Sequence, residues 1–147
     1  MNSDDEVVAH AMGILLKRLR QPGASMSSPD TVKNYLTLKL ATAEREVFGT
    51  LWLDVQNRIV AEDDLFFGSV THTNVHPREV IKTALRHNAA AVILYHNHPN
   101  GQPDPSTADK ALTTMLCSTL GTVEVRMLDH LIVAGTQTFS FAEHGML

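Results

Sequence analysis

The stretch that decides the fold reads His96-Asn97-His98-Pro99-Asn100-Gly101-Gln102-Pro103-Asp104-Pro105-Ser106-Thr107-Ala108-Asp109. It follows an apolar run over residues 89–95, which is short enough for a strand that is covered on both faces. Side chains alternate along an extended chain, so a strand that continues through His98 points His96 and His98 to one side and Asn97 to the other. Two imidazoles on one face can share a metal ion, for which neutral imidazole is a good ligand.

The loop after these histidines is stiff, because it contains three prolines and proline fixes the backbone angle φ. Ser106 then stands at the N-cap of a helix that we expect over residues 106–120. Asp109 falls in the first turn of that helix and can aim its carboxylate back at the histidines. Two histidines and one carboxylate with a fourth position left for water are typical of catalytic zinc, which lowers the pKa of bound water to about 7.

Two structural interpretations compete with metal binding. Ser106 and Asp109 resemble a capping pair, in which a serine and an acid bond to each other's backbone at a helix start without any metal. A lone His-x-His is likewise more common as a packed or surface pair than as a ligand set. Same-face histidines at the end of a buried strand, a stiff loop and an acid in the next helical turn occur together here, and that coincidence favours a metal site.

Hydrophobic periodicity predicts helices and strands around this segment. Helices are expected over residues 4–20, 29–43, 77–87 and 106–120, and strands over residues 46–54, 58–67, 89–95, 122–128, 131–134 and 138–141. They mix without strict β–α–β alternation, which indicates an α+β fold with a mainly antiparallel or mixed sheet. Residues 1–28 are predicted to be an N-terminal helical extension of a domain over residues 29–147. The two N-terminal helices should pack on the rest, because about 40 residues make a poor core alone.

Composition limits the class of protein. Of the 147 residues, 44% are hydrophobic and 19% charged, which excludes a disordered chain. The net charge of −4 gives no support for binding many phosphates, although a local nucleic-acid-binding face stays open. The single cysteine, Cys117, cannot form an intrachain disulfide and fits a reducing compartment. We expect a cytoplasmic protein, because no apolar run reaches the roughly 18 residues of a membrane span and the N-terminus lacks the positive region of a signal peptide.

The spacing also resembles a known family. His-x-His, seven residues, Ser, two residues and Asp is the motif of the JAMM (MPN-type) metalloproteases, and it fits the histidines, Ser106 and Asp109 without a spacing error. Other segments resemble the RadC-like branch of that family over roughly residues 30–147: His-Asn-His-Pro-x-Gly, Pro77-Arg78-Glu79-Val80, Asp129-His130-Leu131-Ile132-Val133 and Ser140-Phe141-Ala142-Glu143. Asn100 departs from the pattern, which more often has serine there.

The resemblance implies an MPN-like α/β fold, related in layout to the cytidine deaminases, with zinc on His96, His98 and Asp109. It also implies an upstream glutamate that activates the zinc-bound water. The matching position is Glu46, with Glu44 as a nearby rival; from the residues alone, Glu46 is an exposed acid at a strand end. In this interpretation the glutamate moves a proton from water to the leaving amine, and the Ser106 hydroxyl bonds the developing oxyanion unless it is occupied in capping its helix.

The function implied by the resemblance is a zinc-dependent hydrolase that acts on a peptide or isopeptide bond of a peptide or protein substrate. Two alternatives stay open: a non-catalytic interaction module on the same fold, and a zinc-dependent enzyme acting on nucleic acid, since the family label refers to DNA repair. The Pro-Cys-x-x-Cys motif of zinc deaminases is absent. Longer family members carry a region that resembles a helix–hairpin–helix module, and residues 1–28 do not match it. A homo-oligomer is compatible with the sequence.

The remaining histidines are interpreted as structural. His72 and His76 flank the loop before a helix, and His87 lies near a helix end, where a cation suits the helix dipole. His130 follows Asp129; a hydrogen-bonded histidine between two strands is favoured there over an orienting pair with that acid.

Overall fold

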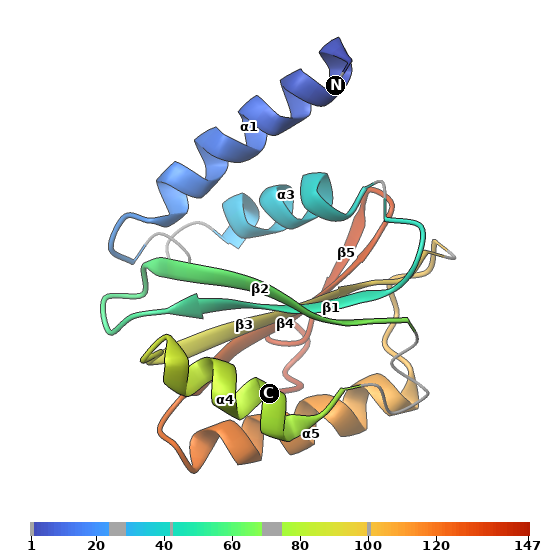
Figure 1. Cartoon of the computed structure of the whole chain (residues 1–147). Coiled ribbons are helices and arrows are strands. Elements are labelled where there is room, and N and C mark those ends of the chain that lie inside the picture. Colours follow the sequence, from blue (N-terminus) through green and yellow to red (C-terminus); the bar gives the residue numbers. More distant parts are fainter. Residues whose placement is uncertain (1, 24–28, 42, 69–74, 100) are drawn as a thin grey trace.

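A computed structural model describes residues 2–23, 29–41, 43–68, 75–99 and 101–147, and these form one mixed sheet with helices on both faces (Figure 1). The strands lie in the order β2-β1-β3-β4-β5. Only the β3–β4 pair is parallel among these strands, and the other neighbours are antiparallel. The predicted α+β architecture with a mixed sheet is therefore confirmed. The strands are β1 (Val47–Leu53), β2 (Ile59–Phe67), β3 (Ala91–Asn97), β4 (Arg126–Ala134) and β5 (Gln137–Ser140), and the helices are α1 (Ser3–Leu19), α3 (Pro29–Leu40), α4 (Pro77–Arg86) and α5 (Thr107–Gly121).

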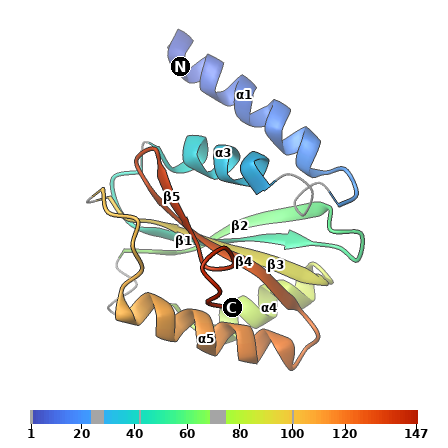
Figure 2. The ribbon, with the colours of Figure 1, turned by 180° about the vertical axis from the view of Figure 1, so that it is seen from behind.

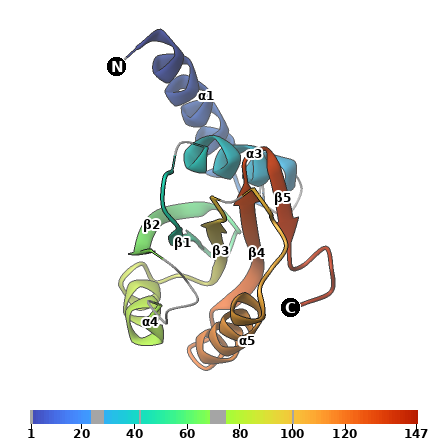
Figure 3. The same cartoon turned by 90° about the vertical axis from the view of Figure 1, so that its right-hand side faces the viewer.

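The sheet is sandwiched between two helical layers, with α1 and α3 on one side and α4 and α5 on the other (Figure 3). The central strand β3 is buried along its whole length, as its apolar sequence predicts. Ile93 and Tyr95 pack in the cluster that includes α3, whereas Val92 and Leu94 pack in the cluster that includes α5. Alternation along the strand then sends the His96 side chain to the α5 face.

Helix α5 connects the parallel strands β3 and β4, which could not be joined by a tight turn. It runs along the sheet from the loop after β3 to the start of β4 (Figure 2). The first turn of α5 consequently lies beside the carboxyl end of β3. This crossover brings the two halves of the sequence motif to the same edge of the sheet.

One strand replaces two predicted strands near the C-terminus. The prediction of separate strands over residues 122–128 and 131–134 is wrong, because β4 runs without a break from Arg126 to Ala134. The polar pair Asp129-His130 suggested an interruption, but the Asp129 carboxylate is satisfied inside the fold. It accepts hydrogen bonds from the backbone N–H of His130 (2.7 Å), the backbone N–H of Ala142 (3.0 Å) and the Ser140 hydroxyl (2.6 Å).

The other boundaries differ from the predictions by a few residues. Strand β3 extends to Asn97, two residues beyond the predicted end, and α3 ends at Leu40 rather than near residue 43. The predicted packing of the N-terminal helices on the rest is confirmed, since Leu19 of α1 lies in the same buried cluster as α3. The first half of α1 projects from the body (Figure 1). Among the described helices, none combines the length and apolar character that crossing a bilayer requires.

Candidate metal centre

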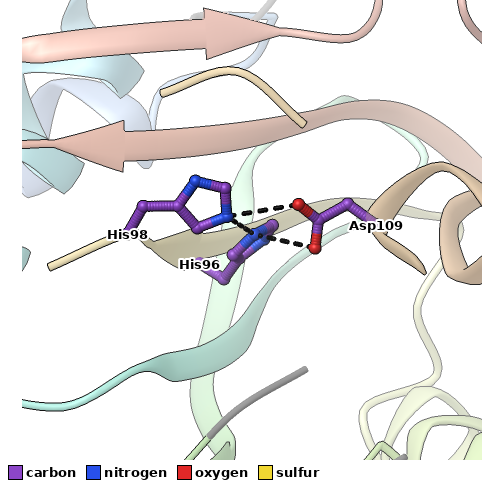
Figure 4. A group of neighbouring side chains, drawn as sticks. All are labelled: His96, His98 and Asp109. Carbon is purple, nitrogen blue, oxygen red and sulfur yellow. Dashed lines mark hydrogen bonds and ion pairs between the residues drawn. The ribbon is translucent and has the colours of Figure 1, made fainter. Parts of the chain in front are cut away.

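Three side chains of the sequence motif meet at the carboxyl end of β3 (Figure 4). His96 lies within the strand and is fully buried, His98 follows its end and is partly exposed, and Asp109 is buried in the first turn of α5. The His96 Nε2 atom lies 3.0 Å from His98 Nε2 and 3.3 Å from Asp109 Oδ1. His98 Nε2 lies 3.2 Å from Asp109 Oδ2. The structure thus brings the three predicted ligands together.

The spacing of these donor atoms suits a metal ion. Ligand atoms at 2.0–2.1 Å from a tetrahedral zinc lie about 3.3 Å from one another, close to the separations seen here. With a single carboxylate oxygen of Asp109, the three donor atoms all lie within 4.8 Å of one another, so the group could hold one metal ion. Two imidazole nitrogens and one carboxylate are a donor set that divalent transition metals accept.

The position of the hydrogen on the His98 ring also favours a metal ion. His98 Nδ1 lies 2.8 Å from the carbonyl oxygen of Gln102, and a carbonyl can only accept, so Nδ1 donates. Neutral His98 then carries a lone pair on Nε2, which faces the Asp109 carboxylate. Two acceptors at this distance repel each other unless a cation lies between them. The site is therefore complementary to a metal ion or, without one, to a proton.

Shifted pKa values agree with this electrostatic arrangement. The hydrogen bond to Asp109 raises the pKa of His98 above its usual value, although burial opposes the shift. Burial acts to raise the pKa of Asp109, but the hydrogen bonds with His96 and His98 outweigh it and hold that pKa well below its usual range. Both shifts favour a proton on His98 beside an ionised Asp109, and a bound metal ion would take the place of that proton.

Asp109 and Ser106 also form the predicted capping pair. The Ser106 Oγ atom accepts the backbone N–H of Asp109 (3.0 Å), and Asp109 Oδ2 accepts the backbone N–H of Ser106 (2.8 Å). The sequence presented capping and ligation as rival interpretations. In the structure they are compatible, because the carboxylate that caps the helix also faces both histidines.

Glu46 lies just before β1 and is half-buried, whereas Glu44 is exposed. The negative charge of Glu46 is the smallest of the causes that raise the pKa of His98, after the hydrogen bond to Asp109. The sequence predicts that the Asn97 side chain points away from His96 and His98. Its side chain binds the segment around Glu46, accepting from the backbone N–H of Val47 (2.7 Å) and donating to the carbonyl of Arg45 (3.1 Å).

The favoured interpretation of His130 as a hydrogen-bonded histidine inside the sheet is confirmed, but its partner His96 was not foreseen. His130 is completely buried, and its Nε2 atom lies 2.8 Å from His96 Nδ1. Burial, followed by the charge of His96, lowers its pKa well below the usual value. The orienting pair with Asp129 does not form, because the Asp129 carboxylate accepts a hydrogen bond from the backbone N–H of His130 and not from its ring. A period-two pattern through β4 was the available signal, but the predicted break at this point hid it.

The other histidines fit the structural interpretation where the structure describes them. His87 Nε2 lies 2.8 Å from Asp63 Oδ2, and the ring of His76 meets the ring of Phe66 edge-on at 5.8 Å. His72 and Asn100 lie outside the described residues. Cys117 is a free cysteine and is half-buried.

Comparison with known proteins gives the family. The family model described as RadC-like JAB domain matches residues 26–146. The chain belongs to this RadC-like JAB domain family. Its match includes all three candidate metal ligands together with Glu46 and Ser106. The mixed sheet described above is accordingly a JAB (MPN-type) domain, as the sequence resemblance implies.

Relatives of this RadC-like JAB domain fall into two length classes. The UPF0758 proteins YkfG and YeeS of Escherichia coli K12 are each 49% identical, over 98% and 96% of this chain and 91% and 95% of their own lengths. The UPF0758 protein HEAR2468 of Herminiimonas arsenicoxydans is 53% identical over 86% of this chain, but the match covers 57% of that protein. The chain thus spans little more than half the length of the longer relatives.

Proposed function

We propose that this RadC-like JAB domain is a zinc-dependent hydrolase that attacks a peptide or isopeptide bond. The observation that carries the proposal is the convergence of two imidazole nitrogens and a carboxylate, with the single N–H of neutral His98 directed at the carbonyl of Gln102 and its Nε2 atom facing Asp109. Zinc, when bound there by His96, His98 and Asp109, supplies a water of pKa about 7 and polarises the carbonyl of the substrate. The partial exposure of His98 leaves one side of the site open to a substrate.

Glu46 is the general base of this proposal. The antiparallel register pairs Phe48 with His96, and continuing it by one more step of two residues, backward along β1 and forward along β3, brings Glu46 level with His98. Its carboxylate takes a proton from the attacking water and later delivers that proton to the leaving amine nitrogen. Glu44 is the weaker candidate, because it is exposed and lies further from the start of β1 than Glu46 does.

Ser106 is the proposed donor to the oxyanion. A hydroxyl has one hydrogen to donate and two lone pairs to accept with. Capping of α5 uses a lone pair of Ser106 Oγ, since that atom accepts the backbone N–H of Asp109. The hydroxyl hydrogen therefore stays available for the oxygen that becomes negative during attack on the carbonyl.

Zinc content and turnover test the proposal together. Purified protein is loaded with zinc, its bound zinc is measured by atomic absorption, and hydrolysis of a fluorescence-quenched peptide library is followed. Wild type and Glu46→Gln should both hold about one zinc per chain, and the variant should hydrolyse about 10²–10⁴-fold more slowly. Glu44→Gln is the matched control and should keep the wild-type rate.

Three results would contradict the proposal. Absence of bound zinc in the wild type removes the metal site. Zinc binding with equal, background rates for wild type and Glu46→Gln identifies an interaction module. Zinc-dependent cleavage of labelled single- or double-stranded DNA, without peptide hydrolysis, moves the activity to nucleic acid.

A further inference from the structure

The side chain that orients His96 comes from the neighbouring strand. The ring of His130 stacks on Phe141, with centroids 4.7 Å apart and an interplanar angle of 9°, and it meets Phe48 edge-on at 5.9 Å. Its Nε2 atom lies 2.8 Å from His96 Nδ1, and its Nδ1 atom lies 2.6 Å from Thr113 Oγ1. Packing therefore fixes the plane of the His130 ring, which lies between His96 of β3 and Thr113 of α5.

The hydrogen of the Thr113 hydroxyl can be assigned from its partners. Thr113 Oγ1 lies 2.7 Å from the carbonyl oxygen of Asp109, which can only accept. If the hydroxyl donated to His130 instead, two oxygen acceptors would face each other at that distance in a buried place. The hydroxyl therefore donates to the Asp109 carbonyl, and its lone pair faces His130 Nδ1.

This assignment fixes both imidazoles in turn. His130 must donate from Nδ1 to the hydroxyl, and a neutral imidazole has a single N–H, so its Nε2 atom is an acceptor. His96 Nδ1 then donates to that acceptor. The hydrogen of neutral His96 is thus on Nδ1, and its Nε2 atom presents a lone pair to Asp109 and His98.

We propose that His130 and Thr113 are positioning residues that hold His96 in the tautomer whose Nε2 lone pair faces the metal. The proposal rests on the metal site proposed above, and it adds two residues that the motif does not contain. His98 reaches the same tautomer through the loop carbonyl of Gln102. The chain of hydrogen bonds to His96, which we call the relay, starts from the main-chain oxygen of Asp109. Asp109 therefore supplies one metal ligand and also determines which nitrogen of His96 carries the hydrogen. Hydrogen-bond partners of this kind commonly change metal affinity by 10–100-fold.

Threonine variants test the relay with little change in shape. Thr113→Val keeps the volume and removes the hydroxyl, whereas Thr113→Ser keeps the hydroxyl and serves as the rescue. Thr114→Val is the matched control, because Thr114 makes the same hydrogen bond to the carbonyl four residues earlier but is exposed. Ring-nitrogen NMR of metal-free protein at alkaline pH reports which nitrogen of His96 and His130 carries hydrogen. Zinc titration reports affinity independently of any hydrolysis.

Wild type, Thr113→Ser and Thr114→Val should carry hydrogen on Nδ1 of both rings and bind zinc equally. Thr113→Val should shift His96 toward hydrogen on Nε2 and bind zinc about tenfold more weakly. Hydrogen on Nε2 of His96 in the wild type overturns the relay, as does a Thr113→Val protein with unchanged ring signals and affinity. The predicted tautomers in a protein that takes up no zinc would support the relay and remove the proposed function instead.

Discussion

Ser106 and Asp109 hold each other by reciprocal hydrogen bonds, and the Asp109 oxygen that accepts from Ser106 lies 3.2 Å from His98 Nε2. The carboxylate is therefore oriented by the start of α5 before any ligand arrives. Pre-orientation matters because a donor that is already in place loses little freedom when it binds an ion. The stability of this helix start and the affinity for metal should be coupled.

Replacement of Ser106 by alanine tests that coupling. Ser106→Ala should lower the free energy of unfolding by about 1 kcal/mol and weaken zinc binding, because Asp109 loses one of the two bonds that fix it. Asn2→Ala is the control: Asn2 caps α1 in the same way, accepting the N–H of Asp5 at 2.8 Å, far from the site along the chain. Urea denaturation and zinc titration give both quantities. Equal zinc affinities in the two variants would disprove the coupling.

Zinc affinity and metal-free stability should depend on pH in opposite directions. The hydrogen bond to Asp109 raises the pKa of His98, so the folded metal-free protein holds that proton more tightly than the unfolded chain. This stabilisation is fully present below the unfolded pKa and is lost as pH rises through the raised folded pKa. Zinc needs neutral His98, so its affinity should fall by up to about tenfold per pH unit as pH drops below the raised pKa.

Denaturation without metal and zinc titration, both repeated across this pH range, measure the two trends. Asp109→Asn keeps an oxygen that can cap Ser106 but removes the charge. This variant should lose the pH dependence assigned to His98 and most of the zinc affinity. A wild-type protein whose zinc affinity stayed constant from mildly acidic to alkaline pH would argue against histidine ligation.

Asn97 should control rate more than metal binding. Its side chain binds the backbone on either side of Glu46, and it is almost fully buried. Asn97→Ala leaves the N–H of Val47 without its partner, at a cost of about 1–3 kcal/mol in the free energy of unfolding. The peptide hydrolysis rate should fall while zinc affinity stays unchanged, because neither histidine is touched. An equal loss of both would show that Asn97 acts on the metal ligands instead.

Gly49 should be irreplaceable in the middle of β1. A Cβ atom there would collide with the ring of Tyr95, which is fully buried and donates its hydroxyl to Asp64 Oδ1 at 2.6 Å. Gly49→Ala should lower the free energy of unfolding by about 2 kcal/mol or more. Gly13→Ala in α1, where nothing lies within 4 Å, should instead raise it by about 1 kcal/mol. Urea denaturation of both variants checks this, and a Gly49→Ala protein as stable as wild type would contradict the packing.

The sequence predicted the site best where the signals were local. Strand β3 is a continuous apolar run, and α5 starts at a serine with an acid three residues later, so both could be placed from the printed residues. The same short segment also implies that the end of β3 and the start of α5 lie at the same edge of the sheet. The prediction of the three ligands needed no knowledge of distant strands.

The contacts that were missed depend on pairing between distant segments. His130 meets His96 only because β4 lies parallel to β3, with His130 opposite Leu94 and Ile132 opposite His96. No local pattern indicates that register, so His130 could be predicted as a hydrogen-bonded histidine between strands but not as the partner of His96. The link between Asn97 and the segment around Glu46 likewise depends on the antiparallel pairing of β1 with β3.

All three candidate metal ligands come from a single short span that runs from the end of β3 to the first turn of α5. Closing a loop of about ten residues costs little chain entropy, since that cost grows only as the logarithm of length. If the proposed zinc site is correct, zinc should also bind this span before the strands have assembled, and such binding to the unfolded chain subtracts from the stability that the ion confers on the folded one. The ion should then raise the refolding rate more than its effect on the melting temperature suggests, because it closes this loop before the sheet forms.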